Sequence, residues 1–101
     1  MGHGSSIDKK SAKTLIEKFQ EDNPNEKKAF LFDASKIQEL LEDSPSIAGV
    51  RIYMGKKTNN DLCVILVGTD SDNNDMTDDM ILEYGSPCPT ECPDSSYFNI
   101  D

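Results

Sequence analysis

The stretch VRIYMGKKTNNDLCVILVGTD, residues 50–70, decides the fold of this 101-residue chain. Two apolar runs flank a polar segment, which is typical of a β-hairpin whose connection is longer than the tight two-residue type. Residues 62–67 are apolar at every position, as in a central strand that is covered on both faces. This hairpin therefore predicts the middle of a β-sheet.

The first strand of the hairpin has one apolar and one mixed face, because apolar side chains alternate with Arg51 and Tyr53. Arg and Tyr are both favoured at binding hot spots, so the two residues are a candidate interaction pair. The alternative is that they only pack on the surface of the sheet. The sequence leaves both interpretations open.

Two helices and a short strand are expected before the hairpin. Residues 8–23 are predicted to form an amphipathic helix with Asp8 as its N-cap. A strand at residues 28–32 and a second helix that ends near residue 43 follow. The residues expected to face inward are Ala12, Leu15, Ile16 and Phe19 in the first helix and Ile37, Leu40 and Leu41 in the second.

After the hairpin we expect one more strand at residues 80–84, antiparallel to the strand before it. The tail that follows is rich in Pro, Ser and Asp, and we expect it to be irregular, with Tyr97, Phe98 and Ile100 anchoring its end. The order α-β-α-β-β-β predicts an α+β domain with an antiparallel sheet and both helices packed mainly on one face.

The chain length fits one domain. Residues 1–6, MGHGSS, resemble the remnant of an expression tag and contain the only histidine, His3. We assign residues 7–85 to a single α+β domain and residues 86–101 to the tail.

Two helices on one face would leave one side of the apolar strand uncovered. The uncovered row would be either Cys63, Ile65 and Val67 or Leu62, Val64 and Leu66. Exposed apolar area usually marks an interface, so this row predicts contact with the tail, a protein partner or a second copy.

The net charge of −9 is concentrated in the second half, where residues 51–101 carry three basic and ten acidic side chains. Such a surface disfavours nucleic acid and anionic membranes as partners. No apolar run approaches the length of a membrane span. Because three cysteines form no dense disulfide framework and no export signal is visible, we expect a cytoplasmic protein with free thiols.

The acidic loop that begins at Asp70 is one candidate metal site, with Asp70, Asp72, Asn74 and Asp75 as its oxygen ligands. Calcium prefers such ligands, and the spacing imitates the first half of an EF-hand loop. The imitation fails at the sixth position, which is Asp75 in place of glycine, and at the twelfth, which is Ile81 in place of glutamate. A solvated turn is the alternative.

Cys88 and Cys92 are the second candidate, because their CxxxC spacing could close a small disulfide or supply two thiolates to zinc. One copy lacks the four N or S ligands of a structural zinc site, so zinc would have to be shared between two copies. Cys63 is interpreted as a small buried core residue.

No catalytic constellation is visible. Histidine-based triads are missing once His3 is set aside, and no nucleotide-binding glycine motif is present. We therefore expect no enzyme activity.

Several segments resemble a group of short proteins from Bacteroidetes bacteria that has no assigned biochemical role. They are GVRIYMGK at residues 49–56, LCVILVGTD at 62–70, ILEYG at 81–85 and PCPTEC at 87–92, together with the pair Asn74 and Asp75. The resemblance implies a standalone bacterial domain and brings no catalytic residues. The function predicted from the residues is a small acidic interaction module. It would bind a protein partner or itself through an uncovered sheet face, an edge strand or the acidic C-terminal half. Calcium or zinc binding in a regulatory domain is the alternative.

Overall fold

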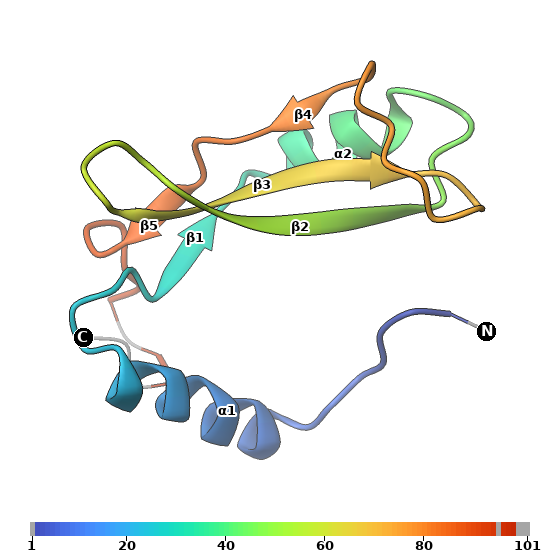
Figure 1. The fold of residues 1–101 in the computed structure, drawn as a ribbon. Helices are drawn as coiled ribbons and strands as arrows, with labels where there is room; N and C mark the ends of the chain where they lie inside the picture. Colours follow the sequence, from blue (N-terminus) through green and yellow to red (C-terminus); the bar gives the residue numbers. More distant parts are fainter. Residues whose placement is uncertain (1, 95, 99–101) are drawn as a thin grey trace.

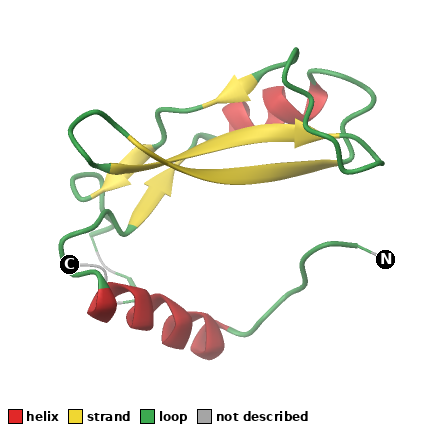
Figure 2. Ribbon diagram, in the orientation of Figure 1, coloured by secondary structure: helices red, strands yellow, loops and turns green. Residues whose placement is uncertain are grey.

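The structure is a computed structural model that describes residues 2–94 and 96–98. It is an α+β fold with two antiparallel sheets (Figures 1 and 2). The elements in chain order are α1 (Lys9–Asp22), β1 (Ala29–Leu31), α2 (Ala34–Glu42), β2 (Gly49–Lys56), β3 (Leu62–Thr69), β4 (Ile81–Leu82) and β5 (Ser86–Cys88). The predicted class and the predicted order up to β4 are confirmed.

The hairpin of β2 and β3 is the centre of the larger sheet, as predicted. Its register runs from Gly49 opposite Thr69 to Lys56 opposite Leu62, and β4 pairs with the other side of β3. The strand order β2-β3-β4 makes β3 central and places β2 at an edge. Alternation of side chains along an antiparallel pair therefore sets which residues of the two strands share a face.

The prediction of one uncovered row on β3 is wrong. Cys63, Leu66 and Val67, which belong to both rows, are buried, and the other members of the two rows, Leu62, Val64 and Ile65, are half-buried. The exposed apolar side chains of this hairpin lie on β2 instead, where Ile52 is 61% and Met54 is 64% exposed. An edge strand has a neighbour on one side only, so its side chains are less covered than those of the central strand.

Helix α2 lies beside the three-stranded sheet (Figure 1). It begins after Asp33 and buries Leu40 completely, whereas the adjacent Leu41 is 46% exposed. The chain leaving α2 then packs Ile47 on Gly68 of β3, where an added Cβ atom would come within 3.1 Å of Ile47.

Helix α1 lies apart from the three-stranded sheet (Figure 1), so one helix rather than two packs on that sheet. Its N-terminus forms as predicted, because the Asp8 carboxylate accepts a hydrogen bond of 2.6 Å from the amide of Ser11. None of its residues is buried, and Leu15 is 66% exposed. Tyr97 of the tail lies against α1, with its ring centroid 4.8 Å from the ammonium groups of Lys9 and Lys13. The predicted anchor Ile100 lies outside the described residues.

The start of the tail is a strand, so the expectation of an irregular tail is wrong for Ser86–Cys88. This strand, β5, pairs antiparallel with β1, with Pro87 opposite Phe30. Proline is tolerated at sheet edges because it lacks only the amide donor. The bend between β4 and β5 requires Gly85, where an added Cβ atom would lie 2.6 Å from the Phe32 ring. Neither described helix is long and apolar enough to cross a membrane.

Candidate functional site

Residues from two separately predicted sites meet on the mixed face of β2. The Asp75 carboxylate accepts hydrogen bonds from the Arg51 guanidinium and from the Tyr53 hydroxyl. Arg51 also donates to the carbonyl oxygen of Asn73 at 3.1 Å. The predicted interaction pair and one predicted metal ligand therefore form a single cluster, which joins the acidic loop to β2.

This cluster changes the proton affinities of all three side chains. The Tyr53 hydroxyl and then the Arg51 guanidinium hold the pKa of Asp75 below its usual range. The carboxylate in turn raises the pKa of Arg51 and that of Tyr53, mainly through the hydrogen bonds that it accepts. At neutral pH a charged Asp75, a charged Arg51 and a neutral phenol therefore stabilise one another. The face of β2 that carries them is occupied by the loop.

The rest of the acidic loop is organised by its own backbone. One carboxylate oxygen of Asp70 accepts hydrogen bonds from the amides of Asp72 at 2.9 Å and Asn74 at 3.0 Å. The Met76 amide then donates to the carbonyl oxygen of Gly68, and Asp75 bridges to Thr69, so the loop pairs with the last residues of β3 beyond the part that β4 covers. The side chains of Asp72 and Asn74 are exposed. The arrangement is that of a closed turn tied to the sheet.

Within the described residues no group of three or more His, Cys, Asp or Glu side chains could hold a metal ion. Asp75 faces a cation of the protein, and Asp70 faces backbone amides. These contacts explain how the loop holds its shape with protein groups alone. Calcium binding by the loop stays a prediction.

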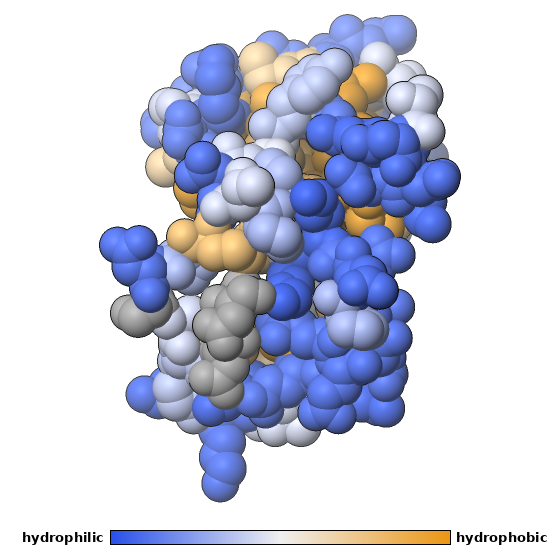
Figure 3. Space-filling model, turned by 90° about the vertical axis from the view of Figure 1, so that its left-hand side faces the viewer, coloured by the Kyte–Doolittle hydropathy of each residue, from blue (hydrophilic) through white to orange (hydrophobic). Residues whose placement is uncertain are grey.

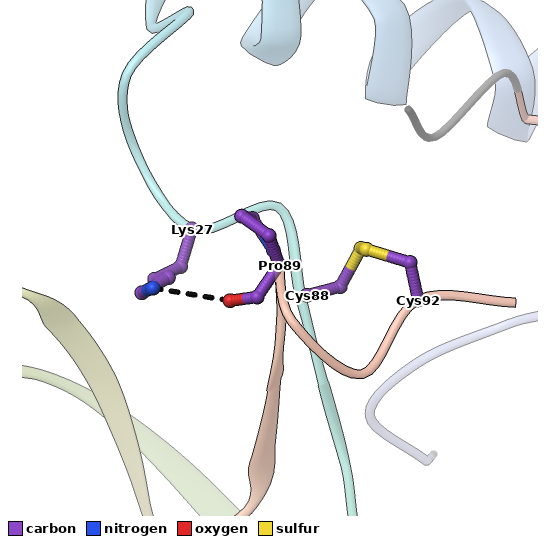
Figure 4. The surroundings of a disulfide bond; sticks show 4 residues. All are labelled: Lys27, Cys88, Pro89 and Cys92. Carbon is purple, nitrogen blue, oxygen red and sulfur yellow. Dashed lines mark hydrogen bonds between the residues drawn. A yellow bond between two sulfur atoms is a disulfide. The ribbon is translucent and has the colours of Figure 1, made fainter.

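Cys88 and Cys92 form a disulfide bond (Figure 4). The expectation of free thiols is therefore wrong for this pair, although Cys63 is free and buried, as expected. Cys88 ends β5, where its carbonyl oxygen accepts from the Lys28 amide, and the Lys27 ammonium donates to the Pro89 carbonyl at 3.0 Å. With their sulfur atoms bonded to each other, the two cysteines are not thiolate ligands in this state.

The outer edge of β2 shows which strand is the edge strand that the sequence suggested as a binding surface. The Lys57 amide donates to the Asp61 carbonyl at 2.9 Å, which makes 57 and 61 a hydrogen-bonded pair of the hairpin. Such pairs alternate along an antiparallel ladder, so the odd-numbered residues of β2 direct their N–H and C=O groups to β3. The residues that direct these groups outward are Val50, Ile52, Met54 and Lys56.

No described residue contributes a backbone hydrogen bond to these outward groups. The side chains on the same four residues share one face of the sheet, and two of them are the exposed Ile52 and Met54. The Gly49 end of β2 also borders an open concavity of about 650 Å³, whose other wall includes Gly2 and His3. Apolar surface is visible among hydrophilic side chains in the upper part of Figure 3, above the hydrophilic region around α1.

A signal for this edge was present in the predicted order. A strand at residues 80–84 that pairs with β3 leaves β2 without a second neighbour. The sequence names an edge strand as one possible binding surface, but the alternation at Val50, Ile52 and Met54 shows only that one face of the strand is apolar.

No protein-family model, curated protein or solved structure matches the chain. The resemblance to short Bacteroidetes proteins therefore stays a prediction.

Proposed function

We propose that the protein is a small interaction module that binds a protein partner, or a second copy of itself, through the outer edge of β2. The single observation that supports this is the row of unpaired N–H and C=O groups at Val50, Ile52, Met54 and Lys56. Unpaired groups along a strand are a template for an added strand, because each can form a hydrogen bond to an extended backbone.

The side chains of β2 support strand addition at this edge. Ile52 and Met54 are exposed on one face, beside the place that an added strand would take. In strand addition the main chain supplies affinity and the alternate side chains supply specificity. The partner would therefore be an extended segment with apolar side chains opposite Ile52 and Met54.

Arg51 and Tyr53 have a supporting role in this proposal. Both are engaged with Asp75 on the opposite face, and they hold the loop against β2. A strand that is fixed on one face loses less conformational freedom when another strand pairs with its edge. Arg51 and Tyr53 are therefore positioning residues.

The remaining predictions about function are unchanged. A protein partner is proposed, and nucleic acid and membranes are not, because of the net charge of −9. No observation favours catalysis or metal binding as a second function. The Cys88–Cys92 disulfide argues against the proposed cytoplasmic location, because disulfides persist mainly in oxidising compartments and the cytoplasm is reducing.

Panning a display library of random linear peptides against the protein and against Met54→Pro tests the proposal. Proline removes one outward amide of β2 and leaves the hydrogen bonds to β3 in place. We expect peptides that bind the original protein and not the variant, and that slow hydrogen exchange at the amides of Ile52 and Met54. Peptides that bind both proteins equally, or that leave these amides unprotected, would contradict strand addition.

A further inference from the structure

The outward groups of β2 are complementary to themselves. The four residues that carry them, Val50, Ile52, Met54 and Lys56, are spaced symmetrically about Tyr53. We propose that the strand added to this edge is β2 of a second copy, antiparallel to the first, with a two-fold axis beside Tyr53. This inference rests on the proposed function and names its partner.

In this register every outward residue meets another outward residue. Ile52 lies opposite Met54 of the second copy, and Val50 lies opposite Lys56 of the second copy. Such opposite residues in an antiparallel ladder exchange both N–H···O=C hydrogen bonds. The edges of both strands are then fully paired, and the two three-stranded sheets join into one continuous sheet. A two-fold contact of this kind is the commonest form of oligomer.

The same register brings exposed apolar side chains together. Directly opposite residues of a strand pair share a face, so Ile52 of each copy contacts Met54 of the other. Their exposed fractions of 61% and 64% show how much surface is open to this contact in one copy. On the other face, Tyr53 meets Tyr53 of the second copy at the axis. Cross-strand pairs of aromatic and of aliphatic side chains stabilise sheets.

The charges of the hairpin favour the antiparallel orientation. Lys56 and Lys57 lie at the turn, whereas the acidic loop begins at Asp70, beyond the Gly49 end of β2. Antiparallel pairing places the cationic end of each copy beside the acidic end of the other. The lysines and Asp70 of the other copy would then be about two strand spacings apart, about 10 Å. A parallel pair would place the lysines of both copies side by side, at a cost from like-charge repulsion.

Neighbouring registers fit less well. Shifting the axis to Met54 places Arg51 opposite Lys57 of the second copy and leaves Val50 beyond the paired region. Shifting it to Ile52 leaves Lys56 opposite Ala48, outside the strand. Pairing about Tyr53 therefore uses the whole length of β2 and opposes no two cations.

Sedimentation velocity of the full chain, combined with hydrogen exchange, tests the inference. We expect a monomer–dimer equilibrium in which the amides of Ile52 and Met54 become protected as concentration rises from micromolar to millimolar. The Arg51 and Tyr53 amides, which point to β3, should be protected at every concentration. Met54→Pro should shift the equilibrium to monomer by about tenfold or more, and Ile52→Lys provides a second variant that keeps every backbone amide.

Cysteine cross-linking tests the register. Residues at a non-hydrogen-bonded position have Cα atoms about 4.5 Å apart, within the range of a disulfide. Tyr53→Cys should therefore form a cross-linked dimer on mild oxidation. Lys56→Cys is the matched control, because its two copies would be about 20 Å apart along the paired strands and should not cross-link. Efficient cross-linking at 56 but not at 53 overturns the register.

Two results separate this inference from the proposed function. A strict monomer at millimolar concentration that still binds peptides along β2 overturns the second copy as partner and leaves strand addition standing. A strict monomer that also fails to bind peptides overturns both. A dimer that is insensitive to Met54→Pro and Ile52→Lys, with freely exchanging amides on the β2 edge, uses another surface and overturns the second copy as the strand added to β2; peptide binding along β2 then decides whether strand addition stands.

Discussion

At the scale of single residues, Asp75 stabilises the acidic loop by accepting hydrogen bonds from Arg51 and Tyr53. The pKa of Asp75 is lowered, chiefly by the Tyr53 hydroxyl, so the folded state favours the charged carboxylate. A lowered carboxyl pKa contributes stability at pH values above the ordinary value of 3.8, and this contribution is lost as pH falls through the lowered pKa. The raised pKa of Tyr53 acts in the opposite sense, so its contribution is lost as pH rises above 10.

Asp75→Asn should destabilise the protein between about pH 5 and 9, because the charged acceptor is lost. Below the ordinary carboxyl pKa the wild-type protein loses the same contribution, so the free energies of unfolding of the two proteins should converge. Urea denaturation at a series of pH values measures the difference. Asp72→Asn is the control, since it removes an exposed carboxylate from the same loop. Parallel curves for wild type and Asp75→Asn would show that the cluster does not set the pH dependence.

At the scale of elements, the local patterns of the chain predicted most of the fold. Alternating apolar residues located β2, a run of apolar residues located β3, and Asp8 marked the start of α1. These features depend on neighbours in the sequence. The apolar face of α1 was also visible, but its periodicity could not tell which part of the molecule it faces.

The elements that were missed depend on contacts between distant segments. β5 forms because β1, far upstream, offers a partner for SPC, a sequence that by itself favours a loop. The joining of Arg51 and Tyr53 to Asp75 likewise depends on how the loop folds back over β2. The edge of β2 follows from strand order, which is a property of the whole sheet. No local signal at these residues carries that information.

The burial of α2 gives a prediction for this element. Leu40→Ala should lower the free energy of unfolding by about 2–5 kcal/mol, because Leu40 is fully buried and its truncation leaves a cavity. Leu41→Ala is a matched control on the same helix, with the same change of side chain at a residue that is 46% exposed. Chemical denaturation should show a much smaller loss for Leu41→Ala. Equal losses would mean that α2 does not pack on the sheet through Leu40.

At the scale of the whole molecule, the net negative charge opposes self-association, whereas the distribution of the charges favours the antiparallel orientation of the two copies. Two copies with a net charge of −9 repel each other, and salt weakens this repulsion because it shortens the screening length. The paired backbone groups and apolar side chains of the proposed interface are much less sensitive to salt. The positions of Lys56 and Lys57 then matter more than the total charge, because they lie at the interface beside the acidic loop of the second copy.

Lys56→Glu should therefore weaken the dimer more than Lys10→Glu, although both variants change the net charge equally. Lys10 is exposed on α1, away from the three-stranded sheet, so its reversal adds only to the general repulsion. Reversal at Lys56 adds that same repulsion and also removes a cation that faces the acidic end of the other copy. Sedimentation equilibrium at low and high salt separates the two effects, since the excess loss in Lys56→Glu should shrink as salt rises. Equal dissociation constants for the two variants at low salt would place the contact between copies away from β2.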